Sequence, residues 1–132
     1  MTDILDEHGG AAPVGADDAS GWARVCRLPD LTPGRGAAAR VGGRQVALFR
    51  LPEAEEPAVY ALDNRDPFSG AHVLSRGIVG DAAGVPKVAS PVYKQGFDLR
   101  TGACLDDPAV SVPTYPVHVC DEGWVSVAVP RP

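Results

Sequence analysis

The stretch ALDNRDPFSGAHVLSRGIVGD, residues 61–81, joins two strand-like segments through a long irregular one. Its central part, residues 63–77, holds turn residues and small polar groups without regular apolar repeats, which predicts an ordered loop with one short helical turn at 71–75. A second segment of this kind, ASPVYKQGFDLRTG, occupies residues 89–102. The sequence therefore predicts two long loops carried by short strands.

Working outward from these loops, the chain alternates short apolar runs with turns. Gly42-Gly43 predicts a two-residue hairpin turn between 36–41 and 44–51, because glycine supplies positive φ at both positions. In RQVALFRL (44–51), Val46 and Leu48 fall on one face and Ala47, Phe49 and Leu51 on the other. The other expected strands lie at 22–28, 58–62, 78–81, 85–91, 93–99, 115–120 and 124–129, the last two forming a terminal hairpin.

The composition supports an all-β fold. The 132 residues include 15 glycines and 13 prolines, and both residue types are costly inside helices. No 11-residue window carries an apolar stripe of helical period. About nine closely spaced strands are typical of a small antiparallel β-sandwich or barrel.

Charge divides the chain into two parts. Residues 1–19 hold five acidic residues and no Lys or Arg, so they carry the whole net charge of −5. We expect residues 1–20 to form a disordered acidic tail and residues 21–132 to form the folded domain. That domain is electrically neutral, which argues against nucleic-acid binding. Neither a secretory signal nor a membrane-length apolar run is present, which predicts a cytoplasmic location.

The cysteine and histidine residues, which could act in catalysis or bind a metal, are scattered along the sequence. Cys26, Cys104 and Cys120 form no CxxC pair, which excludes a zinc knuckle and a disulfide framework. Cys26 and Cys120 are expected to be small buried hydrophobic residues. His118 alternates within a strand and is expected at the surface, whereas His72 lies in the first loop. Phosphate-binding loops, HExxH and GxSxG are all missing, so the sequence predicts no catalytic residue on this chain.

The two loop segments resemble the cluster-binding loops of Rieske iron–sulfur domains. The likeness rests on the ALDN run (61–64) before the first loop and on residues 96–102 after the second, and it covers about residues 21–129. It implies an all-β, Rieske-like β-sandwich or barrel with two long loops at one end.

The ligand positions of that family are substituted in this chain. Cys-x-His of the first Rieske loop is replaced by Asp66-Pro67-Phe68, and Cys-x-x-His of the second by Ser90-Pro91-Val92-Tyr93. A Rieske centre needs two thiolates and two imidazoles. Because Asp66, Phe68, Ser90 and Tyr93 supply none of these, we expect no metal or cofactor on this chain.

The details DPFSGA, LSRGIVGD and SPVYKQ narrow the resemblance further. Residues 61–81 and 86–108 resemble the small-subunit family of assimilatory NAD(P)H-dependent nitrite reductases. The resemblance implies a non-catalytic subunit that binds a large subunit reducing nitrite to ammonium. That partner is expected to carry sirohaem, an iron–sulfur cluster and FAD and to use NAD(P)H.

The two loops are expected to meet at one end of the β scaffold. A contact surface for the large subunit is predicted there, made of Arg65, Phe68, His72, Tyr93 and Lys94, because Tyr, Phe and Arg are enriched at interfaces. Alternatively, Phe68 and Tyr93 fill the hollow left by the cluster. Two other functions stay open: a Rieske-type [2Fe-2S] electron carrier with unusual ligands, and a free-standing binding module for another oxidoreductase.

Overall fold

The computed structural model describes residues 2–3, 22–51 and 58–129. Most of the predicted acidic tail, and the boundary near residue 20, lie outside the described residues. Only Thr2–Asp3 (β1) is described from that tail, and it pairs in parallel with Ala37 and Ala38.

The described residues form an almost entirely antiparallel β structure, which confirms the predicted fold class. Its strands are β2 (Trp22–Arg27), β3 (Gly36–Val41), β4 (Arg44–Leu51), β5 (Ala58–Asp63), β6 (Ile78–Ala82), β7 (Val85–Ala89), β8 (Gly96–Asp98), β9 (Thr114–Tyr115), β10 (Val117–Val119) and β11 (Trp124–Ala128). Two short 3₁₀ turns, η2 (Leu28–Asp30) and η3 (Leu74–Arg76), accompany them. The second overlaps the helical turn predicted at 71–75 but begins three residues later.

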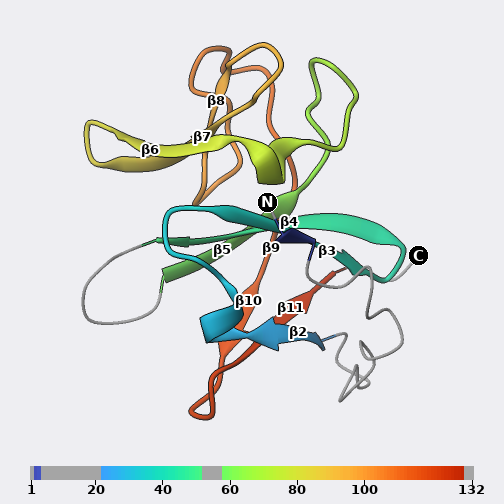
Figure 1. The fold of residues 1–132 in the computed structure, drawn as a ribbon. Helices are drawn as coiled ribbons and strands as arrows, with labels where there is room; N and C mark the ends of the chain where they lie inside the picture. Colours follow the sequence, from blue (N-terminus) through green and yellow to red (C-terminus); the bar gives the residue numbers. More distant parts are fainter. Residues whose placement is uncertain (1, 4–21, 52–57, 130–132) are drawn as a thin grey trace.

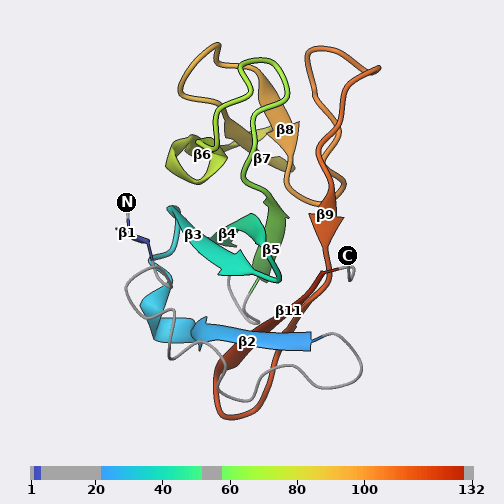
Figure 2. The same cartoon turned by 90° about the vertical axis from the view of Figure 1, so that its right-hand side faces the viewer.

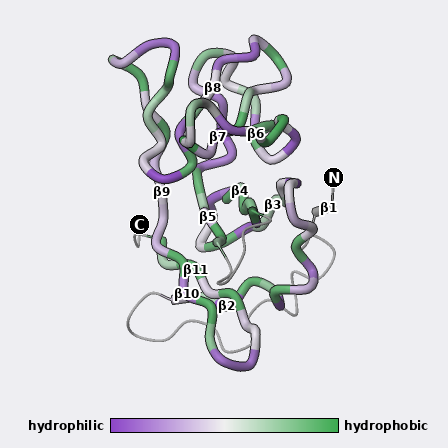
Figure 3. Tube along the Cα trace, turned by 90° about the vertical axis from the view of Figure 1, so that its left-hand side faces the viewer, coloured by the Kyte–Doolittle hydropathy of each residue, from purple (hydrophilic) through white to green (hydrophobic). Residues whose placement is uncertain are grey.

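A five-stranded sheet of order β1-β3-β4-β5-β9 lies in the middle of the molecule, between two three-stranded sheets (Figures 1 and 2). Strand β4 has apolar side chains on both faces, as its alternation predicts. Val46 and Leu48 belong to the core shared with sheet β10-β11-β2. Ala47 and Phe49 belong to a second core shared with sheet β6-β7-β8. In Figure 3 the hydrophobic colour follows these central strands.

The hairpin predicted at Gly42-Gly43 forms with the expected turn geometry, and a second hairpin has a turn of the same kind. Gly42 and Gly43 have φ of 58° and 83°, and they join β3 to β4 in the register Val41–Arg44. Ala83 and Gly84, with φ of 54° and 88°, join β6 to β7 in the same way. These pairs of left-handed residues match the twist of the strands that they connect.

Two predicted strands differ from the observed ones by more than one or two residues at an end. The run 115–120 is divided: β9 pairs with β5 in the central sheet, whereas β10 pairs with β11, because Pro116 interrupts the ladder between them. The run 93–99 yields only β8, since residues 90–95 close on themselves as a loop. Cys120 lies just beyond β10 and is half-buried, whereas Cys26 is buried as predicted.

The second core supports the two loops from below. Its fully buried members include Leu74 from η3, Val88 from β7 and Phe97 from β8. A side chain of this kind contributes about 1.5–3 kcal/mol when buried. The loops therefore rise from a packed base at the end of the molecule opposite sheet β10-β11-β2 (Figure 2). In that distant sheet, Trp22 of β2 lies opposite Ala128 of β11.

Candidate functional site

The two loops, residues 64–72 and 90–96, lie together at one end of the scaffold and are here called the tip (Figure 2). Both are built on the same hydrogen-bond plan. In each loop one residue, Asp66 in the first and Ser90 in the second, makes the same three hydrogen bonds. Its backbone N–H donates to the carbonyl of the residue five positions later, and its backbone carbonyl accepts from the N–H of the residue four positions later. Its side-chain oxygen accepts from the N–H of the residue two positions later. Asp66 does this at 2.8, 2.7 and 2.8 Å, and Ser90 does it at 2.9, 3.0 and 3.1 Å.

The correspondence extends to backbone conformation. The residue four positions after Asp66 is Gly70, with φ of 79°, and the residue four positions after Ser90 is Lys94, with φ of 69°. Glycine adopts this left-handed conformation freely. A residue with a Cβ pays about 1–2 kcal/mol for it. Lys94 is thus held in a strained conformation at the tip, where the first loop uses glycine.

Asp66 and Ser90 also join the loops to each other. The Ser90 hydroxyl donates to Oδ2 of Asp66 at 2.6 Å, while the Phe68 N–H donates to Oδ1. Both Asp66 and Ser90 are buried. A short hydrogen bond to a buried carboxylate is among the stronger interactions of this kind. This Asp66–Ser90 clasp fixes the spacing between the two loops.

The clasp keeps Asp66 ionised. Burial by itself raises the pKa of this carboxyl, because it disfavours the charged form. The hydrogen bonds from the Ser90 hydroxyl, the Phe68 N–H and the side chain and backbone of Ser69 oppose burial and together lower the pKa below its ordinary value. The site therefore holds a buried negative charge that is satisfied by donors of the loops themselves.

The two aromatic residues of the tip take opposite directions. Phe68 is half-buried against the second core, with its ring centroid 6.2 Å from that of Phe97. Tyr93 is 59% exposed, and its neighbour Val92 is 43% exposed. The alternative that both rings fill the interior thus holds for Phe68 alone.

The remaining predicted contact residues lie on the surface. Arg65 and His72 are both exposed and face each other through an antiparallel bridge across the base of the first loop. Lys94 is exposed and its Nζ lies 3.4 Å from the carbonyl of Pro91. At the tip, the side chains of Arg65, His72, Tyr93 and Lys94 are thus exposed, whereas Phe68 packs against the second core.

Comparison with known proteins agrees with this geometry. The family described as "Rieske-like [2Fe-2S] domain" matches residues 21–128. The nitrite reductase (NADH) small subunit of Salmonella typhimurium is 43% identical over 102 residues, which are 77% of this chain and 93% of that protein. The chain belongs to the nitrite reductase small-subunit family.

Two further matches place this small-subunit family in context. The solution structure of a nitrite reductase [NAD(P)H] small subunit from Erwinia carotovora aligns with a TM-score of 0.70 and 44% identity, covering 86% of this chain and 85% of that one. A nitrite reductase [NAD(P)H] large subunit of Klebsiella oxytoca is 47% identical over 98 residues, which are 74% of this chain and only 10% of that protein. A domain of this kind thus also occurs within a much longer chain.

The Rieske-like description implies a [2Fe-2S] cluster, and the residues of this small-subunit family member do not fit one. The oxygens of Asp66 and Ser90 are in direct contact at 2.6 Å, which leaves no space for iron between them. Phe68 turns into the core and Tyr93 turns outward, and neither carries an imidazole. Among the described residues, no group of three or more His, Cys, Asp or Glu side chains could hold a metal ion.

The sequence predicted where the two loops lie, but it did not predict the hydrogen-bond pattern that both loops share or the strained backbone at Lys94. One signal was present: Gly70 stands four residues after Asp66, where the second loop has Lys94 after Ser90. The described part of the chain also contains no helix long and apolar enough to cross a membrane.

Proposed function

We propose that this chain is the non-catalytic small subunit of a cytoplasmic, assimilatory NAD(P)H-dependent nitrite reductase. It acts by binding the large subunit, which reduces nitrite to ammonium. In this proposal the large subunit carries the sirohaem, the iron–sulfur cluster and the FAD and uses NAD(P)H. The small subunit contributes a shaped surface instead of redox chemistry.

The observation that carries the proposal is the left-handed backbone of Lys94. Glycine would occupy that position without strain, as Gly70 does in the first loop. A strained backbone conformation at an exposed loop residue indicates that its side chain has a function, here a contact with the large subunit. Tyr93 beside it is the most exposed aromatic residue described, and such residues anchor protein interfaces.

The clasp supports the same role. A loop that is already ordered loses little conformational entropy when it binds, so more of the contact energy appears as affinity. In Klebsiella oxytoca, a segment like this chain belongs to a nitrite reductase large subunit itself. Covalent linkage holds two modules at a high effective concentration, which is consistent with a domain that works beside the large subunit.

The test is to measure the Kd between the full chain and the purified large subunit, together with the thermal midpoint of each small-subunit variant. Tyr93→Ala should weaken binding by on the order of 1–3 kcal/mol. Lys94→Gly should weaken binding as well, and yet raise stability by up to about 1 kcal/mol because it relieves the backbone. A merely structural role for Lys94 cannot produce these opposite changes.

Ala83→Gly is the matched control, because Ala83 has the same left-handed backbone in the β6–β7 turn. It should raise stability to a similar degree and leave the Kd unchanged. Normal binding by both tip variants, with the fold intact, would remove the tip from the interface. A wild-type chain that does not bind the large subunit would overturn the proposal as a whole.

The electron-carrier alternative has its own test. The contact between Asp66 and Ser90 opposes cluster assembly, so the purified chain should show no Rieske-type absorption after anaerobic incubation with iron and sulfide. A reproducible Rieske-type spectrum would establish the alternative.

A further inference from the structure

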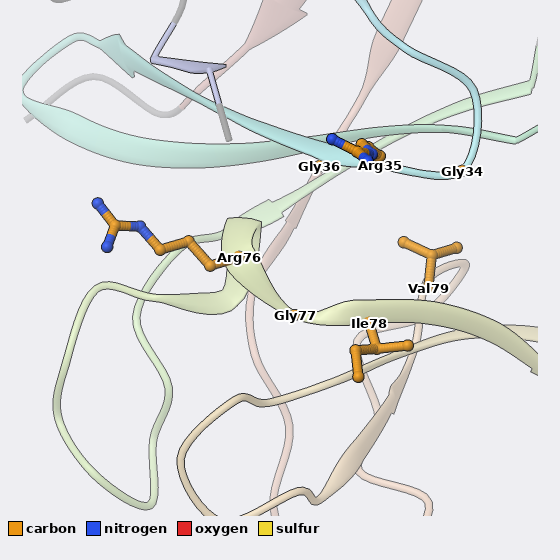
Figure 4. Close-up of a pocket in the computed structure, with 7 residues that line it drawn as sticks. All are labelled: Gly34, Arg35, Gly36, Arg76, Gly77, Ile78 and Val79. Atoms are coloured by element: carbon orange, nitrogen blue, oxygen red, sulfur yellow. The ribbon is translucent and has the colours of Figure 1, made fainter.

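A second surface, away from the tip, has features that the tip does not explain. A pocket of 540 Å³ lies between the start of β3 and the segment that leads into β6. Figure 4 shows the backbone of Gly34–Gly36 crossing opposite that of Arg76–Val79, with Val79 directed toward the Gly34 side. Added Cβ atoms at Gly36 and Gly77 would lie 2.4 Å from the carbonyls of Ser75 and Ala89. These glycines therefore let the pocket walls approach the neighbouring backbone.

Two positive charges flank this pocket. Arg35 and Arg76 are both exposed, and neither side chain has a hydrogen-bond or ion-pair partner among the residues that the structure describes. By contrast, Arg100 pairs with Asp98, and Arg50 donates to two backbone carbonyls. Guanidinium groups left without partners beside a pocket attract carboxylates, with which they form paired hydrogen bonds.

An exposed apolar residue and a free strand edge adjoin the pocket. Ile78, the first residue of β6, is 70% exposed, more than any other large hydrophobic residue described, and its side chain lies on the side of β6 opposite to that of Val79 (Figure 4). Strand β6 is the outer strand of sheet β6-β7-β8, so one edge of its backbone is unpaired within that sheet. An exposed edge of this kind accepts an extended segment of another chain.

We propose that this surface, made of Arg35, Arg76, Ile78 and the edge of β6, binds an extended acidic segment of the large subunit. Carboxylates of that segment pair with the two arginines, and an apolar side chain covers Ile78. This inference rests on the proposed function, since it names the same partner, and it adds a second contact on a different face. Charge complementarity selects an acidic segment over a basic or neutral one.

The experiment uses the full chain and the purified large subunit, with the Kd measured at low and moderate salt. Arg35→Glu and Arg76→Glu should each raise the Kd about tenfold and reduce its salt dependence, while the thermal midpoint stays unchanged. Ile78→Ser should raise the Kd without altering the salt dependence. Arg24→Glu makes the same charge change on the distant sheet β10-β11-β2 and should change the Kd less than about twofold.

The outcomes separate the two proposals. If the wild-type chain binds and the pocket variants bind equally well, the second contact is wrong and the proposed function stands. An Arg24→Glu effect as large as that of Arg35→Glu would mean a general charge effect, which also refutes the second contact. If Arg35→Glu weakens binding and Tyr93→Ala does not, the pocket is the interface and the tip is not. A wild-type chain that does not bind refutes both.

Discussion

Breaking the clasp between Ser90 and Asp66 should lower the free energy of unfolding, because the buried Asp66 carboxylate then loses hydrogen bonds. The Asp66 carboxylate accepts from the Ser90 hydroxyl at 2.6 Å and from the Phe68 N–H at 2.8 Å. A hydrogen bond to a charged group contributes about 1.5–3 kcal/mol. Asp66→Ala removes the acceptor of these two bonds and should cost about 3–6 kcal/mol, whereas Ser90→Ala removes one donor and should cost about 1.5–3 kcal/mol.

Urea unfolding, followed by the fluorescence of Trp22 and Trp124, measures these costs for both single variants and the double variant. Because the two side chains share one bond, the double variant should cost less than the sum of the singles, by about 1–2 kcal/mol. Asp107→Asn is the control, since Asp107 caps an exposed turn through a similar bond to Ala109 and should cost under about 0.5 kcal/mol. Additivity within about 0.3–0.5 kcal/mol would show that the clasp is not a coupled interaction.

Acid should weaken the clasp as well. The pKa of Asp66 is lowered in the folded protein, below the ordinary value of about 3.9. The unfolded chain then binds more protons than the folded chain as the pH falls, so the stabilising contribution is present above about pH 4 and is lost as the pH falls through the folded pKa. Asp66→Asn should remove this part of the acid dependence. Equal slopes of unfolding free energy against pH below 5 in wild type and variant would contradict this reasoning.

Gly77→Ala should cost about 2–4 kcal/mol in urea unfolding, because the new Cβ would lie 2.4 Å from the carbonyl of Ala89, whereas Gly80→Ala, with open space around it, should be neutral within about 0.5 kcal/mol. Burial, aided by the charge of Asp30, raises the pKa of Cys26 to about 12, so iodoacetamide at pH 8.5 should modify this thiol only after unfolding, as mass spectrometry can show. Deletion of residues 1–19 should leave the thermal midpoint within a few degrees of wild type, since that segment is acidic, poor in large apolar groups and paired with β3 only through Thr2 and Asp3 among its described residues; a larger fall would mean that the segment contributes more to stability than this short pairing.

Local patterns predicted the features that local physics governs. The alternation in residues 44–51 predicted which apolar residues share each face of β4, and Gly42-Gly43 predicted the hairpin turn, because each depends only on residues close in sequence. The division of 115–120 at Pro116 was missed, although proline cannot donate to a ladder, because the two halves have partners in different sheets.

The candidate site was predicted in outline and not in detail. The resemblance of the loops located the tip, but the inward direction of Phe68 depends on its contact with Phe97, which lies beyond both loops. The clasp joins residues 24 positions apart, and no local pattern states that Asp66 and Ser90 will touch. Contacts of this range depend on how the whole second core packs.

The pairing of Trp22 with Ala128 has a consequence for how such a domain can be carried by a longer protein. The start of β2 and the end of β11 lie side by side, in the sheet farthest from the tip (Figures 1 and 2). A host chain can therefore enter and leave through one narrow base, as an inserted module requires, without passing near the tip loops. The same adjacency lets a short linker join the two ends directly, so that new termini can be opened elsewhere on the surface with the tip loops unchanged.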